Sequence, residues 1–163
     1  MDTLFFQDKD FELHKGDCIE ILNQLPEKSV DLIFADPPYF LSNGGITCKA
    51  GKVVSVNKAE WDKSNGFTKD SEFNEQWINA CRRVLKDDGT VWISGTMHNI
   101  YQIGFALQKL NFNILNEISW FKPNAPPNLT CKYFAHSHET VLWARKNKSI
   151  PHYFNASVAS TGV

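Results

Sequence analysis

The sequence predicts an α/β protein built on one open, mostly parallel and doubly wound sheet. Apolar runs of strand length alternate with stretches of helical periodicity along most of the chain. Residues 30–35 (VDLIFA) are mostly apolar, which is typical of a strand buried on both faces of a parallel sheet. The chain has 163 residues, the length of a single domain.

The first elements follow from local signals. We expect a short strand within residues 13–18 that ends in a turn, followed by a helix over residues 18–25. Asp17 can cap this helix, and Pro26 ends it. The buried strand at residues 30–35 comes next.

A long irregular stretch separates this strand from the next helix. Residues 36–69 show no sustained period, and a loop of this length in a compact domain is usually functional or mobile. An apolar stripe then predicts a helix over residues 71–85, with Ser71 and Asn74 suited to its N-terminus. The acidic and glycine residues 87–89 are expected to stop it.

The second half continues the alternation. We expect a strand at residues 90–94, a helix over 98–110, and two strands at 112–121 and 140–144 that can pair as a hairpin. The proline-rich residues 122–137 between those strands must form a loop.

Composition excludes several classes of protein. With 42% hydrophobic and 21% charged residues, the chain is not disordered as a whole. A net charge of −1 argues against a protein that mainly coats nucleic acid. No apolar run approaches the roughly 20 residues of a membrane helix, and the N-terminus lacks signal-peptide features, so we expect a cytoplasmic protein. No metal is expected, because the four cysteines lack zinc-site spacing: Cys18, Cys48, Cys81 and Cys131.

The candidate site follows the most apolar strand, at Asp36-Pro37-Pro38-Tyr39. Ligands of open α/β sheets bind beyond the carboxyl ends of the strands. Two prolines stiffen the backbone, so the Asp36 carboxylate and the Pro37 carbonyl stand together as two acceptors suited to one amino group. The Tyr39 ring suits a flat heterocycle. The alternative is an Asx turn that two prolines merely rigidify.

These residues resemble the catalytic motif of amino-group DNA methyltransferases. With the further segments that match, the chain resembles the β-class DNA adenine-N6 methyltransferases, and most closely the second adenine methylases of GATC restriction systems. The resemblance reaches to about residue 155 and is carried by residues 13–18, 34–46 (FADPPYFLSNGGI), 60–62 (EWD), 89–101 and 127–147. It implies the Rossmann-like methyltransferase fold.

The resemblance also implies a mechanism. S-adenosylmethionine is the methyl donor, and the target adenine is swung out of the DNA helix. Asp36 and the Pro37 carbonyl accept hydrogen bonds from the two N6 hydrogens of the adenine, and Tyr39 stacks on the base. Pro38 is the remaining residue of this catalytic motif. Phe40 either lines the same pocket or belongs to the core. No covalent intermediate is needed, because positioning and electrostatics suffice.

Further binding residues are implied in the same way. Asp17, with the adjacent Cys18 and with Asp36, matches the cofactor-binding positions, although Asp17 as a simple helix cap is an equal alternative. Residues 122–148 are locally basic with interleaved aromatic residues, which suits DNA contact. The candidates for DNA contact are Lys122, Asn124, Asn128, Lys132 and Arg145. The lysines of the long loop could meet DNA phosphates, but solvent exposure on the loop is the simpler interpretation for each of them: Lys49, Lys52, Lys58, Lys63 and Lys69.

The chain departs from the family in one respect. The glycine-rich cofactor loop, which follows the recognition segment in the family, has no counterpart, and no G-x-G occurs anywhere. We therefore expect residues 1–150 to be the catalytic part of a methyltransferase and residues 151–163 the start of the recognition segment or a tail. On this interpretation the isolated chain binds S-adenosylmethionine poorly and is marginal in stability. Three alternatives stay open: a truncated gene product, a gene prediction cut short, or one half of a split enzyme whose second chain carries the glycine-rich loop.

Two other functions stay open. Cytosine-N4 methylation would keep the fold, but those enzymes more often carry Ser where Asp36 stands. An inactive or split fragment would act only as a DNA- or partner-binding module, and the near-neutral charge counts against this.

Overall fold

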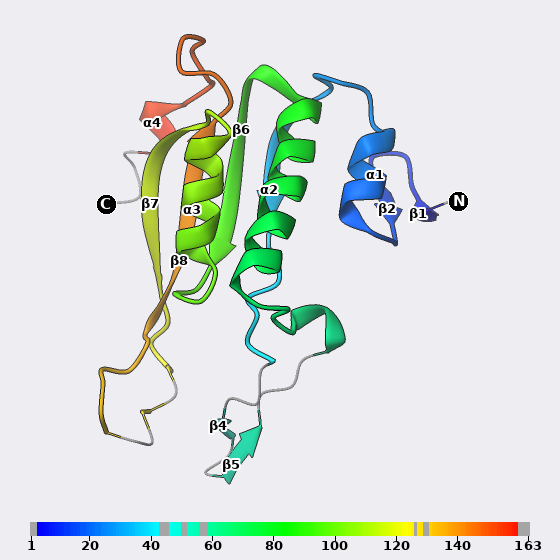
Figure 1. Cartoon of the computed structure of the whole chain (residues 1–163). Coiled ribbons are helices and arrows are strands. Elements are labelled where there is room, and N and C mark those ends of the chain that lie inside the picture. Colours follow the sequence, from blue (N-terminus) through cyan, green and yellow to red (C-terminus); the bar gives the residue numbers. More distant parts are fainter. Residues whose placement is uncertain are drawn as a thin grey trace.

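The computed structural model describes residues 3–42, 46–49, 52–55, 59–125, 127–128 and 131–159 (Figure 1). In chain order the elements are β1 (Leu4–Gln7), β2 (Glu12–His14), α1 (Cys18–Gln24), β3 (Val30–Ala35), β4 (Ile46–Lys49), β5 (Lys52–Ser55), η1 (Glu60–Asp62), α2 (Phe67–Val84), β6 (Leu85–Gly95), α3 (Ile100–Lys109), β7 (Asn113–Phe121), β8 (His138–Arg145) and α4 (Ala156–Ala159).

The main sheet has four strands in the order β3-β6-β8-β7. β3 and β6 are parallel, whereas β8 is antiparallel to both β6 and β7. The expected α/β class and the β7–β8 hairpin are confirmed. The sheet of this chain is mixed rather than mostly parallel, because the hairpin supplies two of its four strands. Two small antiparallel pairs, β1–β2 and β4–β5, lie outside it, and β1, β4 and β5 were not expected from the sequence.

Helices α2 and α3 lie side by side on one face of the sheet, and the core fills the space between (Figure 1). Alternate side chains of β6 and β8 point to this face, among them Val91, Ile93 and Ala144, which are fully buried. From the helices, Ile78 and Ile103 are equally inaccessible. Burial of each large aliphatic side chain contributes about 1.5–3 kcal/mol to stability, so this layer fixes where the strand ends stand.

The N-terminal helix forms as its cap signal predicts. The Asp17 carboxylate accepts the backbone N–H groups of Ile19 at 2.9 Å and Glu20 at 3.0 Å. The helix ends at Gln24, two residues before Pro26. The strand ahead of it stops at His14 and pairs with β1.

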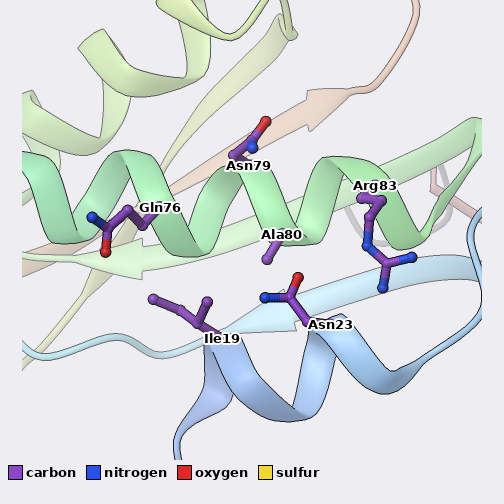
Figure 2. A pocket seen from close by; sticks show the side chains of 6 residues that line it. All are labelled: Ile19, Asn23, Gln76, Asn79, Ala80 and Arg83. Atoms are coloured by element: carbon purple, nitrogen blue, oxygen red, sulfur yellow. The ribbon is translucent and has the colours of Figure 1, made fainter.

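A shallow groove separates α1 from α2 (Figure 2). Its volume is about 250 Å³, and Arg83 closes one end by donating to the carbonyls of Leu22 and Leu25, both at 2.7 Å. The residues that line it are Ile19, Asn23, Gln76, Asn79, Ala80 and Arg83. No member of the Asp36–Tyr39 motif is among them.

Helix α2 begins at Phe67, earlier than expected, so Ser71 and Asn74 lie inside it and do not cap it. Asn74 is fully buried; it accepts the Trp77 indole N–H at 3.0 Å and donates to Gln102 at 3.3 Å. The capping preference of Asn is thus overridden by tertiary hydrogen bonds. The helix ends at Val84, and residues 87–89 lie within β6, where the register with β3 shifts.

Strand β3 is buried on one face only, which corrects the expectation of two buried faces. Ile33 and Ala35 pack against the core, but Leu32 is 55% exposed and Phe34 is 61% exposed. The reason is that α2 and α3 occupy the opposite face, and that β3 forms an edge of the four-stranded sheet.

The face away from α2 and α3 carries a stacked pair of indoles. Trp92 of β6 and Trp143 of β8 lie 4.8 Å apart, with rings inclined by 19°. His152 and Phe154 contact Trp143 at ring distances of 5.2 and 5.6 Å, so residues after 150 pack against this sheet.

Several sequence expectations fall outside the described residues. These are Lys58, Pro126, residues 160–163, and the side chains of Cys48, Lys49 and Lys52. Within the described ranges, no helix is long and apolar enough to cross a membrane. The same part of the chain contains no group of three or more His, Cys, Asp or Glu residues placed to hold a metal ion.

Candidate active site

The Asp36 carboxylate stands at the carboxyl ends of the two parallel strands, held by two hydroxyl groups. Its Oδ1 accepts from the Tyr39 hydroxyl at 2.6 Å and from the Ser94 hydroxyl at 2.6 Å. The Tyr39 and Ser94 oxygens are themselves 3.1 Å apart. Ser94 is 2% exposed and belongs to β6, so the neighbouring strand fixes the orientation of the carboxylate.

Tyr39 is held in this arrangement by its phenolic hydroxyl, which donates to Asp36. Burial, and then the hydrogen bond to Asp36, raise the pKa of the Tyr39 phenol well above its ordinary value. The phenol therefore stays neutral and keeps donating to the carboxylate across the physiological pH range.

The two prolines place their carbonyls differently. Asn99, which is fully buried, donates to the Pro38 carbonyl at 3.0 Å and accepts the Thr96 backbone N–H at 3.0 Å. Among the described residues no hydrogen bond reaches the Pro37 carbonyl. A carboxylate and an adjacent carbonyl acceptor are thus held on a stiff backbone, an arrangement that suits the two N–H groups of an amine.

Sequence reasoning identified the motif but missed its supports. Ser94 lies at the end of a strand that the pattern does predict, so the rule of carboxyl ends pointed to its position and not to its role. Asn99 carries no such signal, because an Asn before a helix is ordinarily a cap. Phe40, assigned to the pocket or the core, is half-buried beside the motif.

The two residues matched to the cofactor lie at the start of α1. The Asp17 carboxylate caps that helix, so the capping interpretation is confirmed and the cofactor role stays a prediction. Burial, and then the Asp17 charge, raise the pKa of the Cys18 thiol. Cys18 is therefore a neutral thiol and not an activated nucleophile.

Four of the candidate DNA contacts lie on the loop between β7 and β8. Phe121 pairs with His138, and Thr140 pairs with Gly95. The loop therefore lies at the end of the sheet where β6 ends and where Asp36 follows β3. Lys122 forms an ion pair with Glu139, and Asn128 donates to the Tyr133 carbonyl at 2.5 Å. Asn124 and Lys132 are exposed.

Arg145 is not brought to the others. It pairs with Thr90, in the middle of β6, whereas Ser94 of the site is the last residue but one of that strand. Its guanidinium donates to Asn113 at 2.9 Å. Strand β8 separates Arg145 from the loop by its own length, so the structure does not bring Arg145 together with the other four candidates.

A family model described as DNA methylase matches residues 30–160. This chain belongs to the DNA methylase family. The match runs from β3, ahead of Asp36, through the β7–β8 hairpin, and therefore includes every part of the site described above except Asp17 and Cys18.

Two curated relatives are similar over most of the chain. The type II methyltransferase M2.MboI of Moraxella bovis is 53% identical over 148 residues, which are 91% of this chain and 54% of that protein. The type II methyltransferase M2.DpnII of Streptococcus pneumoniae is 55% identical over 141 residues, 86% of this chain and 53% of that protein. The chain spans about half the length of the curated relatives it matches.

Solved structures share the fold. A PvuII DNA methyltransferase, cytosine-N4-specific, superposes with a TM-score of 0.65 at 18% identity, over 92% of this chain and 54% of that one. A DNA modification methylase of Thermus thermophilus, complexed with S-adenosyl-L-methionine, superposes with a TM-score of 0.57 at 21% identity, over 91% of this chain and 60% of that one. These likenesses confirm the methyltransferase fold that the sequence predicts.

Proposed function

We propose that this chain carries the catalytic part of a DNA adenine-N6 methyltransferase of a restriction–modification system, with GATC as its target. The observation that carries the proposal is the Asp36 carboxylate, held by Ser94 and Tyr39 beside the Pro37 carbonyl at the carboxyl end of the sheet. The similarity to the type II methyltransferases M2.MboI and M2.DpnII supports the biological setting, and the GATC target rests on the resemblance of the sequence to the second adenine methylases of GATC restriction systems.

The chemistry of the site is that of an amine acceptor. Asp36 and the Pro37 carbonyl accept the two N6 hydrogens of a flipped adenine, which draws electron density onto N6 and orients its lone pair. As N6 becomes tetrahedral and positively charged, the Asp36 carboxylate stabilises that charge and receives the surplus proton. The hydroxyls of Ser94 and Tyr39 fix the carboxylate beforehand, so little reorganisation is needed at the moment of reaction.

The described residues fit one side of a cofactor site. S-adenosylmethionine supplies a methyl group as an electrophile when it is bound. The carboxylates of Asp17 and Asp36 suit its ribose hydroxyls and its positive charge, with Cys18 beside the first of them. Because the sequence contains no G-x-G turn, we propose that another segment or a second chain contributes a glycine-rich loop. The exposed Leu32 and Phe34 on the edge strand β3 support such a neighbour.

The test is the transfer of labelled methyl from S-adenosylmethionine to single- and double-stranded oligonucleotides that contain GATC. We expect transfer by the chain co-expressed with a partner that carries the glycine-rich loop, and a loss of at least about 100-fold when the chain carries Asp36→Ala, because the preorganised acceptor is gone. Asp31→Asn is the matched control, since this carboxylate starts the same strand, is exposed and pairs with Lys86. Transfer by Asp36→Ala at the level of the unsubstituted chain would contradict the role of Asp36, and absence of transfer even with the partner that carries the glycine-rich loop would contradict the proposed function.

A further inference from the structure

We infer that Asp62 is a positioning residue that holds the catalytic motif in its working conformation. This inference rests on the proposed function, because it assigns a role within the same site. Asp62 ends the short helix η1 (Glu60–Asp62), which follows the long loop after the motif. Its side chain is fully buried, which is rare for a carboxylate that lacks a cationic partner or several hydrogen bonds.

The Asp62 carboxylate collects four donors from one short segment. Its Oδ1 accepts the backbone N–H groups of Tyr39 and Phe40, each at 3.0 Å. Its Oδ2 accepts the backbone N–H of Leu41 at 3.2 Å and the Ser42 hydroxyl at 2.8 Å. The Asp62 carbonyl accepts the Ser42 N–H at 3.3 Å, so every backbone N–H from residue 39 to residue 42 ends on this one residue.

This convergence sets the backbone conformation. Three successive N–H groups can point at one anion only where the chain curls around it, as in an anion-binding nest. Phe40 accordingly has φ of 57°, in the left-handed region that a bulky residue seldom adopts. Such a conformation persists only when the surroundings impose it, and the buried carboxylate of Asp62 provides that constraint.

The link to the reaction runs through Tyr39. The backbone N–H of Tyr39 is held by Asp62, and its hydroxyl is held on Asp36. Release of the first bond therefore displaces the second, together with the stiff Pro37–Pro38 backbone that carries the carbonyl acceptor. A residue that only stabilised the loop would lack this route to the acceptor geometry.

The test compares Asp62→Asn with Asp70→Asn in the full chain. Asp70 is a matched control, because it is 5% exposed and accepts the Ser64 hydroxyl at 2.5 Å and the Asn65 N–H at 2.9 Å, away from the motif. An Asn side chain presents a donor where Asp62 has only acceptors. We expect amide hydrogen exchange at residues 39–41 to rise at least tenfold in Asp62→Asn, with exchange in β6 and β8 unchanged.

Kinetics give the second readout. In Asp62→Asn, kcat for methyl transfer should fall at least tenfold while KM for S-adenosylmethionine changes less than threefold, and Asp70→Asn should leave both unchanged. Unaltered exchange at residues 39–41 overturns the inference, and so does an equal rise in Asp70→Asn. If the unsubstituted chain transfers no methyl even with the partner that carries the glycine-rich loop, the proposed function fails, while the exchange comparison still decides the inference.

A milder variant covers the case in which Asp62→Asn does not fold. Ser42→Ala removes one of the four donors and leaves the carboxylate in place. We expect exchange at Leu41 to rise two- to fivefold, because the Ser42 hydroxyl helps to hold the Asp62 carboxylate in place, and Oδ2 of that carboxylate accepts the Leu41 N–H. No change at Leu41 in a folded Ser42→Ala chain would overturn the inference.

Discussion

Gly95 is the last residue of β6, and Asn99, which bonds the Pro38 carbonyl of the motif, leaves no room for a side chain there. A Cβ placed on Gly95 would lie 2.7 Å from Asn99 Oδ1 and 2.9 Å from Ile100 Cδ1, closer than real Cβ atoms approach. Gly95→Ala must therefore displace Asn99, which is fully buried and bonds both Thr96 and the Pro38 carbonyl. Each buried partner left unsatisfied costs about 1–3 kcal/mol, so we expect a total loss of about 3 kcal/mol.

The assay is urea unfolding followed by tryptophan fluorescence, with thermal unfolding in parallel. A loss of about 3 kcal/mol should lower Tm by about 10 °C in a chain of this size. Gly104→Ala in α3 is the matched control, because its Cβ would meet Leu142 Cδ1 at an ordinary 3.6 Å. Removal of a glycine from a helix should stabilise by about 0.5–1 kcal/mol. A Gly95→Ala chain as stable as the original would refute the reasoning, as would equal losses in both variants.

Two further predictions concern ionisation and DNA contact. Because the pKa of Tyr39 is raised on folding, folding favours the neutral phenol; the stabilisation is complete below about pH 10, where the unfolded phenol ionises, and is lost as pH rises beyond it. Between pH 9 and pH 11 the free energy of unfolding should therefore fall by about 1 kcal/mol more in the unsubstituted chain than in Tyr39→Phe. Urea unfolding at each pH measures this difference, and the same fall in both proteins would contradict the prediction. For DNA binding, Lys132→Ala should reduce the slope of log K, the logarithm of the DNA-binding constant, against log salt concentration by about 0.7–0.9. Arg145→Ala, at the end of β8 away from the loop, should leave this slope unchanged. Equal effects of both substitutions in a fluorescence-anisotropy titration would place the contact elsewhere.

Elements that depend on near neighbours could be predicted from the sequence. The helix cap at Asp17, the strand over residues 30–35 and the hairpin of β7 and β8 all follow from local patterns. The start of α2 could not be predicted in this way, because the capping preference of Asn74 is outweighed by its buried hydrogen bonds to Trp77 and Gln102. Those bonds join residues whose contact only the folded chain reveals.

The candidate site divides in the same way. Asp36 and Tyr39 lie in one contiguous motif, so the sequence identifies both. The hydroxyl of Ser94 and the carboxylate of Asp62 reach the motif across 58 and 23 residues of chain, respectively, and nothing in their local sequence marks the contact. A buried carboxylate between an exposed tryptophan and a lysine is indistinguishable, in the sequence, from a solvated one.

Proline content explains why one carboxylate is enough to hold this loop. Pro37 and Pro38 have no backbone N–H, so the chain leaves β3 with two residues that need no acceptor. The next N–H groups, from Tyr39 to Ser42, all converge on Asp62. The two proline carbonyls differ, because Asn99 donates a hydrogen bond to the Pro38 carbonyl. The Pro37 carbonyl is thereby left as an acceptor beside Asp36, which is the position that the proposed function requires.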